Sequence, residues 1–191
     1  MKSLFLLPLP LLFLAACGQS APPAKPASQF RPTASIQELM SSIVDPAADS
    51  LWEAVSTETT AAGTVEHQPR TDAEWLAVRQ HAVTLIEATN LLLIEGRTVS
   101  HTLKLEDAHV PGILTPPEVQ KKIDADRPAF AQRAHALHDA GVEALAAIDA
   151  KSAQRLLVAG EKIDQACESC HMVYWYPNAE QPKWPAPIAK P

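Results

Sequence analysis

The chain has 191 residues with 22 acidic and 16 basic side chains, so its formal net charge is −6. An acidic surface of this kind excludes nucleic acid as an expected partner and favours basic proteins. The length suffices for one domain with a hydrophobic core and flanking tails, and the 3 cysteines are too few for a disulfide scaffold.

Residues 1–16 have the pattern of an export signal, because Lys2 precedes an apolar run that is shorter than the about 20 residues needed to span a bilayer. The run ends in Leu-Ala-Ala-Cys17, which resembles the lipobox of bacterial lipoproteins, where the cysteine is lipidated and begins the mature chain. The alternative is ordinary cleavage after Ala16, but Leu14 stands where a small residue is expected. We therefore predict a periplasmic protein anchored to the inner or outer membrane by a lipid at Cys17.

Two proline-containing stretches flank the expected domain. Residues 17–34 are rich in Ala, Pro, Ser and Gln and cannot bury much surface, which predicts a tether. Residues 178–191 are also rich in proline and will not continue a helix. The folded domain is therefore expected at residues 35–177.

Within this domain the apolar residues recur with a helical period, and no run is convincing as a strand. A first helix is expected from Ser35, which has capping-box spacing with Glu38, to Val55, with a kink or a restart capped by Asp45 at Pro46. Three more main helices are expected at residues 71–96, from 126 or 127 to 148, and from 152 to 174. A short helix is expected at 115–118 in the long connection.

The chemistry is concentrated in Cys167-Glu168-Ser169-Cys170-His171, whose Cys-x-x-Cys-His spacing is that of c-type haem attachment. Each thiol adds to one haem vinyl group, and the histidine becomes the proximal iron ligand. On a helix, side chains at i, i+3 and i+4 project from one face. We therefore predict one covalent haem c held by Cys167, Cys170 and His171.

Two alternatives for the cysteine pair are weaker. A redox dithiol expects a strand-helix-strand context, and no strand-like run precedes this motif. A structural zinc site needs four protein ligands, but with Cys17 at the lipid anchor only two thiols remain in the mature domain.

Four amphipathic helices, the last of which carries a Cys-x-x-Cys-His motif near the C-terminus, resemble the class II cytochromes c, the cytochrome c-prime superfamily. The resemblance covers about residues 35–177. It implies an all-α, antiparallel four-helix bundle with the haem attached near its C-terminal end.

The resemblance also implies that the first helix lines the distal face of the haem, where low-spin members place a methionine and c-prime members leave the iron open. Met172 follows His171 directly and cannot reach the opposite haem face, so Met40 is the candidate distal ligand. The alternative for Met40 is a core position on the apolar helix stripe. His81 is the histidine most nearly placed to compete.

The sequence departs from this superfamily at two positions where many members carry basic residues, because Ile36 and Trp175 stand there. Other basic residues are then candidates to pair with the haem propionates, namely Arg97, Lys104 and Arg127. The aromatic residues Tyr174, Trp175 and Tyr176 are expected to pack at the end of the last helix.

The favoured function is electron transfer with redox partner proteins, since an iron held by His171 and Met40 has no free coordination position. The alternative is binding of nitric oxide or carbon monoxide at an open or displaceable distal site. A third is a structural lipoprotein subunit that delivers its haem to a membrane complex. No catalytic constellation stands out, so we do not predict an enzyme, and the sequence leaves open whether two copies form a dimer.

Overall fold

The computed structural model describes residues 29–179. The export signal 1–16, the lipidation of Cys17 and most of the predicted tether and C-terminal tail lie outside the described residues. The elements in chain order are the helix α1 (Ile36–Leu39), the π-helix η1 (Met40–Val44), the helix α2 (Asp45–Glu53), the strands β1 (Ser56–Thr60) and β2 (Gly63–His67), and the helices α3 (Asp72–Leu92), α4 (Pro116–Ala125), α5 (Arg127–Asp149) and α6 (Ala153–Tyr174). None of the described helices combines the length and the apolarity that crossing a membrane requires.

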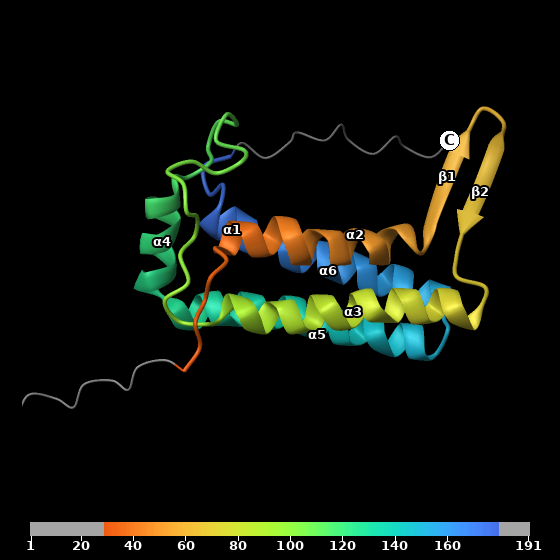
Figure 1. The fold of residues 1–191 in the computed structure, drawn as a ribbon. Helices are drawn as coiled ribbons and strands as arrows, with labels where there is room; N and C mark the ends of the chain where they lie inside the picture. Colours follow the sequence, from red (N-terminus) through yellow and green to blue (C-terminus); the bar gives the residue numbers. More distant parts are fainter. Residues whose placement is uncertain (1–28, 180–191) are drawn as a thin grey trace, which may run out of the picture.

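The predicted all-α, antiparallel four-helix bundle is wrong. The fold is mostly helical but contains a two-stranded antiparallel sheet, in which Ser56 pairs with His67 and Thr60 with Gly63. The β-hairpin extends from one end of the long helices, and α4 lies across their other end (Figure 1). Nothing in the architecture of residues 29–179 supports the covalently attached haem that was part of the same prediction.

The hairpin escaped prediction because every residue of both strands is exposed. A strand is recognised in a sequence by apolar residues that alternate with polar ones, since one face is buried. A ribbon without a buried face carries no such signal.

Capping boxes begin three helices, as their sequences predict. In each, the glutamate carboxylate accepts a hydrogen bond from the backbone N–H of the cap residue. The pairs are Ser35 with Glu38, Thr71 with Glu74, and Thr115 with Glu118.

Pro46 produces a π-helical segment in place of the expected kink or restart. The Asp45 N–H bonds to the Met40 carbonyl, and α2 follows from Val44 without leaving helical backbone geometry. Proline offers no N–H to the Ser42 carbonyl and its ring crowds that oxygen, which the wider turn of a π-helix accommodates. Met40 is therefore the first residue of η1.

The core forms two clusters that meet at the Cys-x-x-Cys-His motif. The first joins α2, α3, α5 and α6 around residues such as Leu85 and Ile163, and Cys167 packs against it. The second joins α1, α4 and the adjoining ends of α3, α5 and α6, and Cys170 packs against it. Met40 contacts both clusters.

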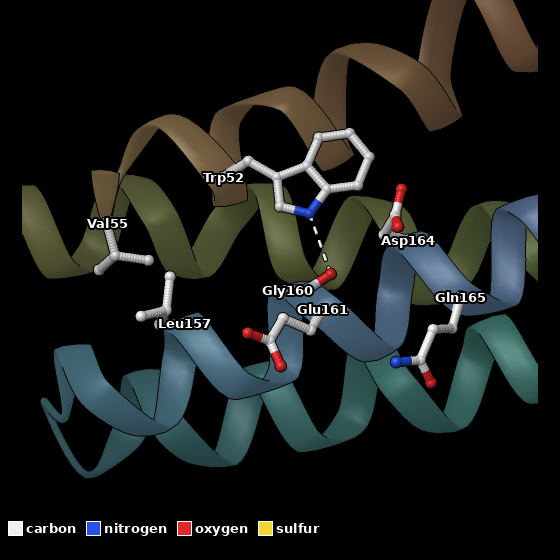
Figure 2. A pocket seen from close by; sticks show the side chains of 7 residues that line it. All are labelled: Trp52, Val55, Leu157, Gly160, Glu161, Asp164 and Gln165. Atoms are coloured by element: carbon white, nitrogen blue, oxygen red, sulfur yellow. Dashed lines mark hydrogen bonds between the residues drawn. The ribbon is translucent and has the colours of Figure 1, made fainter. Parts of the chain in front are cut away.

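Trp52 fastens α2 to α6. Its indole Nε1–H donates a 3.0 Å hydrogen bond to the Gly160 carbonyl (Figure 2). A Cβ at position 160 would lie 3.1 Å from Trp52 Cδ1, so the glycine permits this close approach.

Candidate functional site

The motif residues line two neighbouring cavities. The first has a volume of about 120 Å³ and the second a volume of about 160 Å³. We call them the Trp175 cavity and the Cys167 cavity, because each of these residues lines only one of the two. Both cavities share the side chains of Met40, Asp45, Phe130, Cys170 and His171. Met40 comes from η1 and His171 from α6, so residues 131 positions apart in the sequence border the same spaces.

Other predicted ligands lie elsewhere. His81, on α3, is exposed and lines neither cavity. Met172 is 38% exposed and lines neither cavity. Of the methionine and histidine candidates for the distal position within residues 29–179, Met40 alone borders both cavities together with His171.

The two cysteines are free thiols held in their neutral form. Burial raises the pKa of Cys167 to about 12, and Asp45 and Asp164 add to the effect. Burial also raises the pKa of Cys170, to about 11, although the positive charge of Arg133 opposes it. A redox dithiol needs a thiolate of lowered pKa, so this environment does not favour that alternative.

His171 is held as a neutral imidazole, because burial lowers its pKa while Asp45 and Glu168 act in the opposite direction. A neutral imidazole has the lone pair that binds a metal ion. The centre of the His171 ring lies 6.2 Å from the centre of the Trp175 ring and 6.0 Å from the centre of the Tyr176 ring.

The remaining aromatic contacts hold the end of α6. Tyr174 is buried and meets Phe130 edge to face, with 5.4 Å between the ring centres. The Tyr176 hydroxyl donates to the Glu168 carboxylate, a residue of the motif itself.

Several polar side chains on the cavity walls were not predicted for this site, and three of them have distinctive surroundings. Within the described residues, Gln37 Oε1 is buried and has no hydrogen-bond partner. Asp45 is exposed as a residue, but desolvation of its carboxyl group raises its pKa. Arg133 Nη1 donates a 2.7 Å hydrogen bond to the Ser169 carbonyl.

Helical spacing could have found two of these residues. Gln37 precedes Met40 by three residues and Arg133 follows Phe130 by three, so each pair shares a helix face. Asp45 stands five residues after Met40, and this spacing shares a face only in a π-helical segment.

The basic residues proposed for the propionates do not line either cavity. Arg97 donates to the backbone carbonyls of Leu91 and Ala34. Arg127 donates to the Leu93 carbonyl, and Lys104 is exposed.

Two further features of the surroundings limit the alternatives. Within residues 29–179 no group of three or more His, Cys, Asp and Glu side chains is placed to hold a metal ion, whereas structural zinc needs four such ligands. A groove of about 490 Å³ between α2 and α6 is lined by Trp52 and Leu157, and it contains no residue of the motif (Figure 2).

The chain matches no protein-family model, no curated protein and no solved structure. The function has to follow from the chemistry of the site. Two thiols, an imidazole and a thioether sulfur on adjoining apolar walls are the groups that a c-type haem uses, the thiols for attachment to its vinyl groups and the imidazole and thioether as iron ligands. Each cavity alone, and the two together, are smaller than the about 300 Å³ at which ligand pockets begin, so a haem requires the two cavities to merge and their walls to move apart.

Proposed function

We propose that the chain is a c-type haem protein that transfers electrons. Cys167 and Cys170 would hold the haem through thioether bonds, His171 would be the proximal iron ligand and Met40 the distal one. The similarity to class II cytochromes c enters this proposal through the motif and its position near the C-terminus.

One observation carries the proposal: Met40 and His171 border the same two cavities. Helix α6 carries the thiols and the imidazole, η1 carries the thioether, and both elements border the same cavities. An iron held by an imidazole and a thioether supplies one-electron redox chemistry at a raised potential. The chain's own part is to fix the two ligands from separate helices and to exclude water with apolar walls.

The experiment is an absorption spectrum of the full chain matured in a host that attaches c-type haem, oxidised and reduced, with and without carbon monoxide. A covalent, low-spin haem with a methionine-to-iron charge-transfer band is expected. The band should vanish in Met40→Ala and persist in Met172→Ala, a matched control because Met172 adjoins His171 but lines neither cavity.

Two results would contradict the proposal at different points. If the signal of the parent chain is processed but no covalent haem is attached, haem is excluded as the cofactor. A high-spin parent that binds carbon monoxide and is unchanged by Met40→Ala would remove Met40 as a ligand.

The second result would favour gas binding, for which the structure has a specific feature. Met40 begins a π-helical segment, and such segments are frequent at functional sites. A Met40 withdrawn by such a rearrangement would open the distal position to nitric oxide or carbon monoxide.

The proposal extends to the location and partners that the sequence suggests. Lipidation at Cys17 would hold the domain at the periplasmic side of a membrane, and the acidic chain would attract a basic redox partner. Mass spectrometry of the mature N-terminus tests the lipid, and Cys17→Ser should release the protein from the membrane fraction.

A further inference from the structure

Arg133 connects two helices at the motif. It stands on α5, and its Nη1 atom donates a 2.7 Å hydrogen bond to the carbonyl of Ser169, the residue between the two cysteines and next to Cys170. The positive charge of the same side chain also lowers the pKa of the Tyr174 hydroxyl, against the larger and opposite effect of burial. Arg133 therefore acts on residues of α6 that lie on both sides of His171 along the sequence.

Arg133 is also distinctive in charge. Among the described residues that line either cavity, it is the only arginine or lysine, and therefore alone carries a permanent positive charge. The other charged residues on these walls are the acids Asp45, Glu106 and Asp107. Arg133 is half-buried as a residue, and solvent screens a partly buried charge less than an exposed one.

We propose that Arg133 is a positioning residue of this site, which clamps the Cys-x-x-Cys-His turn through the Ser169 carbonyl and raises the reduction potential of an iron held by His171. The inference rests on the proposed haem function. A nearby positive charge disfavours the oxidised iron, which carries one more positive charge than the reduced iron. Because the guanidinium fork is planar and stays charged, it combines a directed hydrogen bond with a permanent charge.

The test compares three variants of the full-length haem protein. Arg133→Met removes the charge and the hydrogen bond and retains much of the apolar stem. Arg133→Lys retains the charge. Arg127→Met is the matched control, because Arg127 is also half-buried on α5 and donates to a backbone carbonyl, yet lines neither cavity.

The first measurement is the midpoint potential at low ionic strength. We expect Arg133→Met to lower it by about 59 mV, a tenfold change in the one-electron equilibrium. Arg133→Lys should stay near the parent potential, and so should Arg127→Met. A parent-like potential in Arg133→Met, with haem attached at the parent level, would overturn the electrostatic role.

The second measurement is amide hydrogen exchange over residues 167–174 of the chain before haem attachment. The clamp predicts faster exchange in Arg133→Met than in the parent or in Arg127→Met. Equal exchange would overturn the clamp even if Arg133→Met failed to accumulate haem protein. Absence of covalent haem from the parent is a failure of the proposed function, and pyridine haemochrome analysis detects it separately.

Discussion

Gly141 on α5 lies against Ile86 on α3, where the two helices approach closely. A Cβ at this position would stand 2.9 Å from Ile86 Cγ1 and 3.9 Å from Ile86 Cα. Ile86 is 7% exposed, and a β-branched side chain on a helix has essentially one χ1 rotamer, so Cγ1 cannot swing aside. Gly141→Ala should therefore force the helices apart.

The expected change combines two opposing effects. Overpacking of a core costs about 1–3 kcal/mol, whereas replacing glycine with alanine inside a helix stabilises it by about 1 kcal/mol. We expect Gly141→Ala to lower the free energy of unfolding by about 1 kcal/mol. In the Ile86→Ala background Cγ1 is gone, and the same substitution should raise the free energy of unfolding by about 1 kcal/mol.

Urea unfolding followed by circular dichroism measures all four chains of this double-mutant cycle. Ile86→Ala alone should lose about 2–5 kcal/mol from the cavity that it leaves. The decisive quantity is the change of sign for Gly141→Ala between the two backgrounds, a coupling of about 2 kcal/mol. Coupling below about 0.5 kcal/mol would refute the close contact.

Two further predictions concern the start of α3. Thr71→Ala removes the hydroxyl that accepts a hydrogen bond from the Glu74 N–H, and it should lower the free energy of unfolding in urea by about 1 kcal/mol. The control Thr84→Ala, in the exposed middle of α3, should leave the free energy of unfolding unchanged. Equal losses in the two variants would contradict the cap. Lys151 Nζ lies 2.6 Å from Asp72 Oδ1 and holds the pKa of the Asp72 carboxyl below its ordinary value of 3.8. The pair therefore stabilises the folded chain above pH 3.8, and this contribution is lost as the pH falls through the lowered pKa of the folded state. Lys151→Met should return the Asp72 pKa toward 3.8 in a carboxyl-carbon NMR titration, and an unchanged pKa would contradict the pairing.

Helix starts could be predicted because their signals are local. The Thr71 and Glu74 pair lies within four residues, and the same residues form the observed cap of α3. Asp126 likewise accepts from the Ala129 N–H at the start of α5. Such signals do not depend on what the helix packs against.

The overall architecture could not be predicted in the same way. The hairpin is stabilised by its own backbone pairing from Ser56 to His67, and its exposed residues leave no trace in the hydrophobic pattern. Helix α4 closes the second core cluster by burying Val119 and Ile123, a contact that depends on the path of the connection before it. Helix count and order alone therefore gave the wrong fold class.

The candidate site likewise combines residues that the sequence identifies with a residue whose contact depends on helix packing. Cys167, Cys170 and His171 are recognisable because one helix carries all three at fixed spacing. Arg133 reaches the motif from another helix, and its contact with Ser169 exists only after α5 and α6 pack together.

Asp45 shows how one backbone irregularity alters the composition of the site. In an α-helix, residues five apart are about 140° apart around the axis, so Asp45 would face away from the side that carries Met40. The i to i+5 hydrogen bond from the Asp45 N–H to the Met40 carbonyl stacks the two residues instead, and both border the two cavities. Pro46, by withholding a donor from the Ser42 carbonyl, favours this arrangement. The carboxylate beside His171 is thus a consequence of a proline that itself lines neither cavity.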